Sequence, residues 1–251
     1  MPLRRRPDRS RRLSLQQLLP NLITLGAICA GLTAMRLSIE GRISEAVGLI
    51  LLAAVLDGLD GRMARMLRTE SAIGAELDSL ADFMNFGVAV GLLTYVSTLH
   101  EQSSLGWIAV LIYVICCVLR LARFNVGAKA EPAAASSGFT GVPSPAGAML
   151  ALMPLAYERA FPHWPDLPGL VVAVWLIAVA LMLISRVPTP SLKLLRIGSD
   201  KLPYLLVMIV AAAAILITWP WETLLLLNFG YLAVLVWSVV KWRRAGRADE
   251  A

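Results

Sequence analysis

Charged side chains are scarce in this sequence. They make up 16% of its 251 residues, whereas 58% are hydrophobic, and a soluble domain of this length does not need so large an apolar share to fill its core. Apolar stretches of roughly 20 residues, the length that crosses the hydrocarbon of a bilayer, recur along most of the chain. The sequence therefore predicts an integral membrane protein with no separate soluble domain.

Cysteine is scarce as well, and the basic residues are not arranged for nucleic acid. Cys29, Cys116 and Cys117 lie inside apolar stretches at a spacing that matches no zinc or redox motif, so we interpret them as packing residues. The net charge of +6 comes from Lys and Arg at the borders of apolar stretches rather than on a soluble, aromatic-containing face. We therefore expect no nucleic-acid partner.

The apolar runs predict an all-α integral membrane protein with about eight transmembrane helices. We expect one transmembrane domain over 20–240, preceded by a basic juxtamembrane segment at 1–19 and followed by a basic, polar tail at 241–251. The expected spans lie near 20–38, 44–66, 72–97, 105–124, 144–161, 168–187, 203–219 and 222–240.

The distribution of basic residues predicts that both termini are cytoplasmic. Lys and Arg beside membrane spans resist translocation and stay inside. With the N-terminus inside, eight spans leave only Arg36, Arg42 and Arg159 of the 23 Lys and Arg residues outside. The basic segment at 4–19, which also contains leucines, either lies flat on the anionic inner leaflet or only sets the topology.

Acidic residues interrupt two of the expected spans between residues 56 and 83. Asp57 and Asp60 are three residues apart and Asp78 and Asp82 are four apart, so each pair shares one face of a helix. An ionisable residue at membrane depth costs at least ~2.5–3.5 kcal/mol on insertion scales and by default marks a functional site. Two adjacent antiparallel helices would bring the four carboxylates together near their cytoplasmic ends.

Four carboxylates at close quarters repel one another unless cations neutralise them. No Lys, His or Cys lies between Asp57 and Asp82, and oxygen ligands suit Mg²⁺ or Mn²⁺ rather than zinc. We expect two divalent cations that hold the attacking and leaving oxygens of a phosphoryl transfer. Small residues on the facing surfaces either admit a phosphate or nucleotide or only allow close helix packing; these are Gly61, Ala64, Gly74 and Ala75.

The same residues carry a recognisable motif. The segment DGLDGRMARMLRTESAIGAELDSLAD, from Asp57 to Asp82, resembles the signature of the CDP-alcohol phosphotransferases, D-x-x-D-G-x-x-A-R-x8-G-x-x-x-D-x-x-x-D. It matches at every fixed position. The resemblance implies the fold of that family and its reaction, in which an alcohol attacks the β-phosphate of a CDP-linked lipid and CMP is released.

The resemblance also implies roles for individual residues. Asp82 would be the general base as well as a metal ligand. The ligands of the two-metal centre would be Asp57, Asp60, Asp78 and Asp82. The CDP moiety would contact Gly61, Arg65 and Gly74. Asn21, beside Pro20, either faces the nucleotide or only satisfies a helix start.

A second resemblance concerns the acceptor. Residues 119–148, with the runs RLARFN and FTGVPSPA, are similar to the bacterial membrane-embedded phosphatidylserine synthases, as is LPNLITLG at 19–26. This implies CDP-diacylglycerol and L-serine as substrates, and the family resemblance suggests a homodimer. We expect the bacterial inner membrane as location and, from the positions of the basic residues, an active site that faces the cytoplasm.

Basic and polar residues at the end of the fourth span are candidates to bind the acceptor. Arg120 and Arg123 would hold a lipid phosphate or the carboxylate of serine, because guanidinium groups suit planar oxyanions, or they only anchor the span. Asn125 and Lys129 are further candidates.

Two alternative functions stay open at the level of sequence. The same chemistry could use glycerol 3-phosphate, inositol phosphate or choline, since Arg120, Arg123 and Lys129 could form a pocket for a phosphorylated acceptor. An ion-coupled transporter also places acids within the membrane. Asp57, however, lies eleven residues before Arg68, or ~16 Å of helix, which favours a site reached from the cytoplasm.

Overall fold

The computed structural model describes residues 15–67, 71–130, 139–185, 188–189 and 202–248. Helices make up nearly all of this part of the chain. The first half contains α1 (Leu15–Ile39), α2 (Ile43–Leu67), α3 (Ala72–Asp82), the π-helix η1 (Phe83–Ala89), α4 (Val90–Thr94), the π-helix η2 (Tyr95–Leu99) and the 3₁₀ turn η3 (His100–Gln102). The second half contains α5 (Ser103–Ala130), α6 (Ser144–Ala151), α7 (Met153–Ala160), α8 (Gly169–Ile184), α9 (Leu202–Thr218) and α10 (Pro220–Ala248).

Two short strands, β1 (Phe139–Thr140) and β2 (Pro188–Thr189), pair antiparallel. They join the chain before α6 to the chain after α8. Apart from this pair the all-α prediction is confirmed, and helices cover each range in which a span was expected.

Four helical segments of the described chain are long and apolar enough to cross a membrane, by length and composition. These are Leu18–Ile39, Ala72–Leu99, Ser104–Gly127 and Pro220–Lys241. The number of eight spans and the cytoplasmic placement of both termini stay predictions. The first fourteen residues of the expected N-terminal segment and residues 249–251 of the expected tail lie outside the described residues.

One expected span, at 144–161, is divided into two helices. Leu152 separates α6 from α7 with φ −81° and ψ −3°. Pro154 follows two residues later, and a proline cannot donate a backbone hydrogen bond to the preceding turn. The proline therefore explains why a continuous apolar run does not form a continuous helix.

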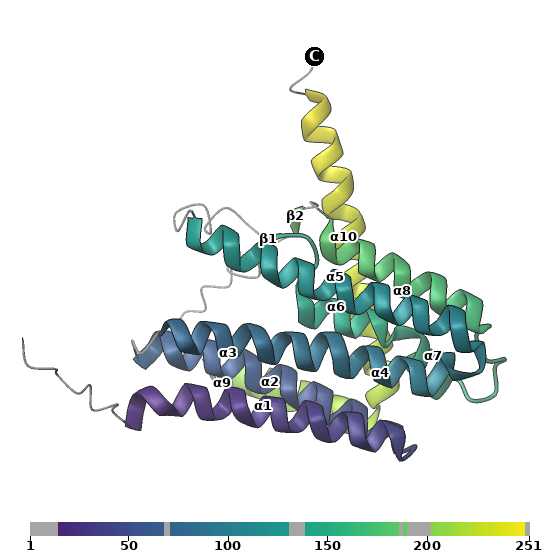
Figure 1. The fold of residues 1–251 in the computed structure, drawn as a ribbon, viewed down its shortest axis with the longest axis horizontal. Coiled ribbons are helices and arrows are strands. Elements are labelled where there is room, and N and C mark those ends of the chain that lie inside the picture. Colours follow the sequence, from purple (N-terminus) through teal and green to yellow (C-terminus); the bar gives the residue numbers. More distant parts are fainter. Residues whose placement is uncertain (1–14, 68–70, 131–138, 186–187, 190–201, 249–251) are drawn as a thin grey trace, which may run out of the picture.

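The first helices form a layer of antiparallel neighbours (Figure 1). The chain reverses between α1 and α2 at Gly41, whose φ of +78° favours glycine. Small residues line the contact between the two helices and let their backbones approach; those buried in the structure include Ala27, Ala30, Ala34, Ala46 and Ala53. Helix α5 packs against η1 and α8, and α10 packs against α7.

The beginning of α3 is fixed by a side-chain cap. Ser71 is extended, with φ −134° and ψ 152°, and its hydroxyl accepts a 3.0 Å hydrogen bond from the Gly74 backbone amide. Such caps satisfy amides that the helix itself leaves unpaired. At this end of the bundle, the beginning of α3 lies beside the first turns of α1 and the last turns of α2 (Figure 1).

Candidate active site

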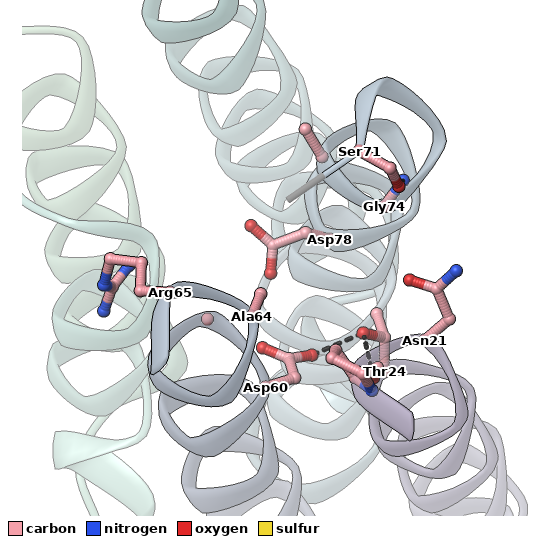
Figure 2. Close-up of a pocket in the computed structure, with 11 residues that line it drawn as sticks. Asn21, Thr24, Asp60, Ala64, Arg65, Ser71, Gly74 and Asp78 are labelled. Atoms are coloured by element: carbon pink, nitrogen blue, oxygen red, sulfur yellow. Dashed lines mark hydrogen bonds between the residues drawn. The ribbon is translucent and has the colours of Figure 1, made fainter. Parts of the chain in front are cut away.

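Three of the acidic residues form a compact group. Asp57 and Asp60 on α2 and Asp78 on α3 each place a carboxylate oxygen within 4.8 Å of the other two. Figure 2 shows Asp60 and Asp78 facing one another between the two helices. Asp60 is only 3% exposed, and its Oδ1 is buried without a hydrogen-bond partner in the described part of the chain. A buried, unpaired carboxylate oxygen in an all-oxygen donor set fits a hard divalent cation.

Asp82 lies one helical turn beyond Asp78. It interacts electrostatically with both Asp57 and Asp78, so all four predicted aspartates converge. Its Oδ1 is also buried and has no hydrogen-bond partner among the residues that the structure describes. Asp82 is therefore close to the group of three without belonging to it.

Thr24 on α1 binds one of the clustered carboxylates. Its hydroxyl donates a 2.5 Å hydrogen bond to Oδ2 of Asp60 and lies 3.1 Å from the carbonyl oxygen of Pro20 (Figure 2). A hydrogen bond of this kind orients the carboxylate and leaves its other oxygen for a ligand. Sequence reasoning did not select Thr24. Its position three residues after Asn21, on the same helix face, is a signal that could have found it.

A cavity of about 260 Å³ adjoins the carboxylates. Three helices line it, α1 on one side and the ends of α2 and α3 on the other. The small residues predicted to face this region all line it, namely Gly61, Ala64, Gly74 and Ala75. The other lining residues are Pro20, Asn21, Thr24, Asp60, Arg65, Ser71 and Asp78. A ligand in this space can approach the backbone of both acidic helices.

Gly74 lies in close contact with Ser71 and with Asn21 on α1. A Cβ at this position would lie 3.0 Å from Ser71 Oγ and 3.1 Å from Asn21 Oδ1. Asn21 therefore reaches the first turn of α3 at the wall of the cavity. Arg65 folds back along its own helix, where its NH1 would lie 3.7 Å from a Cβ at Gly61. In the view of Figure 2, Arg65 and Asn21 lie on opposite sides of the two central aspartates.

Comparison with known proteins identifies the family. The sequence model of the CDP-alcohol phosphatidyltransferases matches residues 17–185, which include every helix that lines the cavity. The chain belongs to the CDP-alcohol phosphatidyltransferase family. The family is membrane-bound and generally dependent on divalent metal ions, and the acidic group of this member fits that chemistry.

Relatives within the CDP-alcohol phosphatidyltransferase family share most of the chain. The CDP-diacylglycerol–serine O-phosphatidyltransferase of Mycobacterium leprae is 36% identical over 97% of this chain and 81% of its own length. The protein of the same name from Bacillus subtilis is 32% identical over 70% of this chain and 91% of its own length. The protein of that name from Helicobacter pylori J99 is 27% identical over 90% of this chain and 91% of its own length.

Arg120, on α5, does not line the cavity. It is buried, and one of its NH groups donates a hydrogen bond to the hydroxyl of Ser144 on α6. Its guanidinium interacts electrostatically with Asp82. Its Nε is buried with no hydrogen-bond partner among the described residues. Arg120 therefore places a positive charge within electrostatic range of Asp82.

The other candidates for acceptor binding occupy different positions. Arg123 donates to the carbonyl oxygens of Ile184 and Ser185, at 3.0 and 3.2 Å, and so pairs carbonyls that the end of α8 leaves free. Asn125 exchanges hydrogen bonds of 3.0 and 3.2 Å with Ser79 on α3. The side chain of Lys129, near the end of α5, lies outside the described residues.

Proposed function

We propose that this protein transfers the phosphatidyl group of CDP-diacylglycerol to the hydroxyl of L-serine and releases CMP. The observation that carries the proposal is the group of acidic residues beside a cavity walled by small residues, within the matched region of the family. Relatives that carry the name CDP-diacylglycerol–serine O-phosphatidyltransferase along most of the chain support serine as the acceptor.

The CDP group binds in the cavity. Gly61 and Gly74 leave room for the nucleotide to approach the helix backbones. Asn21 offers an amide at the wall formed by α1, and Arg65 adds positive charge at the end of α2. Such contacts hold the diphosphate next to the carboxylates.

Two divalent cations, Mg²⁺ or Mn²⁺, complete the site. The residues that would hold them are Asp57, Asp60, Asp78 and Asp82. When bound, the cations supply positive charge that stabilises the negative charge of the diphosphate in the transition state.

Asp82 acts as the general base. Its carboxylate takes the proton of the serine hydroxyl while the hydroxyl oxygen forms a bond to the β-phosphorus. The bond between that phosphorus and the oxygen that leaves with CMP breaks. Arg120 binds the carboxylate of serine, because it is a buried guanidinium within electrostatic range of Asp82. Serine thus lies with its hydroxyl near the base and its carboxylate near the arginine.

The reaction takes place at the inner membrane of a bacterium. We place both termini and the active site on the cytoplasmic side of a single transmembrane domain over 20–240, in a homodimer. The apolar helices support the membrane setting, and the basic residues beside the helix ends support the orientation.

CMP release by the purified protein tests this function. The assay contains CDP-diacylglycerol and Mg²⁺ or Mn²⁺, with L-serine, glycerol 3-phosphate, inositol phosphate and choline offered separately. We expect release with serine alone. Release with a different acceptor would support the transfer reaction and contradict serine as the acceptor. Release with none of them would contradict both parts of the proposal.

A substitution tests the role of Asp82. Asp82→Asn should abolish CMP release while the protein still binds CDP-diacylglycerol, because the amide cannot accept the proton. Asp166→Asn, in the exposed segment before α8, is the matched control and should keep full activity. Equal loss of binding and turnover in Asp82→Asn would contradict the role of a base.

A further inference from the structure

A π-helix begins directly after Asp82. Asp82 is the last residue of α3, and η1 covers Phe83–Ala89. A π-helix is wider than an α-helix and rare in proteins, and it occurs frequently at functional sites. Because its hydrogen bonds join residues five apart, a π-helix also changes how the side chains before it are rotated about the helix axis relative to those after it. The direction in which Asp82 points therefore depends on whether η1 keeps this geometry.

Helix α5 packs against η1 and α4 where both present glycine. A Cβ at Gly87 would lie 3.2 Å from Cys117 Sγ, and a Cβ at Gly91 would lie 3.1 Å from Val114 Cγ2. The two glycines are four residues apart, a spacing that lets helix backbones approach each other in membranes. The close approach brings side chains of α5 within reach of backbone atoms of η1.

Tyr113 uses this proximity to bind the backbone of η1. Its side chain is fully buried, and its hydroxyl donates a 2.6 Å hydrogen bond to the carbonyl oxygen of Phe86. In a setting without water, a buried hydroxyl needs such an acceptor. The bond joins two helices across 27 residues of sequence. It fixes α5 relative to η1 at one specific point.

The same face of α5 carries Arg120. Tyr113, Cys117 and Arg120 are spaced by four and three residues and therefore lie on one side of the helix. Along this side, Tyr113 bonds the carbonyl of Phe86, Cys117 Sγ fills the space that a Cβ at Gly87 would approach, and Arg120 interacts electrostatically with Asp82. A shift of α5 along η1 would move Arg120 away from Asp82.

We infer that Tyr113 is a positioning residue for the transfer reaction. Its hydrogen bond to the Phe86 carbonyl holds α5 and η1 in register, and so fixes the position of Arg120 on α5 relative to Asp82, the residue that directly precedes η1. This inference rests on the proposed function, in which Asp82 is the base and Arg120 binds the acceptor. The hydroxyl acts through these two residues and does not touch the substrate.

Tyr113→Phe in the full-length protein removes this one hydroxyl. We expect kcat for CMP release with serine to fall roughly tenfold or more, since small misplacements of reacting groups have effects of this size. The KM for CDP-diacylglycerol should stay unchanged, because the cavity residues lie on α1, α2 and α3. Tyr157→Phe, on half-buried Tyr157 of α7, is the matched control and should change neither quantity. A wild-type kcat, or an equal change in KM for the lipid, would overturn the inference.

A double-mutant cycle with Arg120→Lys tests the route of the effect. If Tyr113 acts by placing Arg120, the loss from Tyr113→Phe should largely disappear in the Arg120→Lys background. Losses that multiply would overturn the inference. If Tyr113→Phe cannot be purified, Gly91→Ala crowds the contact between the same two helices, because its Cβ would lie 3.1 Å from Val114 Cγ2. That variant should show the same fall in kcat alone, and an unchanged kcat would overturn the inference.

The variants also distinguish this inference from the proposed function. Turnover by Asp82→Asn would overturn the role of the base itself. An inactive Asp82→Asn beside a fully active Tyr113→Phe would overturn only the role of Tyr113.

Discussion

Thr24 on α1 donates a 2.5 Å hydrogen bond to Oδ2 of Asp60 on α2. The bond occupies one oxygen of a carboxylate whose other oxygen, Oδ1, is buried and unpaired within the described part of the chain. The first helix therefore takes part in the site although it contributes no acid. Its hydroxyl orients a group that we propose as a metal ligand.

Thr24→Val should weaken the affinity of the site for metal. The substitution keeps the shape of the side chain and removes the hydrogen bond, and loss of such an orienting bond typically costs about 10–100-fold in metal affinity or activity. We expect the Mn²⁺ concentration for half-maximal CMP release to rise within this range. Thr33→Val is the control, because the Thr33 hydroxyl bonds the carbonyl of Cys29 in its own helix. A metal titration identical to wild type would contradict the orienting role.

Gly74→Ala should impair binding of the CDP-lipid. The added methyl would lie 3.0 Å from Ser71 Oγ and 3.1 Å from Asn21 Oδ1, so one of these side chains must move at the cavity wall. We expect a higher KM for CDP-diacylglycerol with a smaller change in kcat. Gly48→Ala on α2, where a Cβ meets nothing within 4 Å, controls for the substitution itself. If both variants have the same KM, the contact is not part of the binding site.

The pair of Ser79 and Asn125 should behave as a structural link between α3 and α5. Their side chains bond each other at 3.0 and 3.2 Å, so Ser79→Ala and Asn125→Ala should each lower stability by about 1 kcal/mol. The double variant should lose less than the sum, as expected for one shared interaction. Thermal unfolding in detergent measures these changes.

The same variants test whether Asn125 also binds the acceptor. A rise in KM for serine in Asn125→Ala that Ser79→Ala does not reproduce would show direct binding. A shared response would assign Asn125 to the link alone.

Much of the architecture could be predicted because helices in membranes leave local signals. The lengths of the apolar runs located the helical regions. The spacing of Asp57, Asp60, Asp78 and Asp82 indicated that each pair lies on one face of its helix. The division at Leu152 and the π-helix after Asp82 were not predicted. Both depend on how a helix fits its neighbours as well as on its own composition.

The sequence by itself determined the helices, the acidic cluster and the small residues around it, because helical periodicity relates residues only three or four positions apart. Only the tertiary structure decided which side chains meet across helices. It paired Thr24 with Asp60, Arg123 with the carbonyls at the end of α8, and Tyr113 with the backbone beside Asp82. These contacts depend on the rotation and separation of whole helices, which close packing of alanine and glycine fixes in three dimensions.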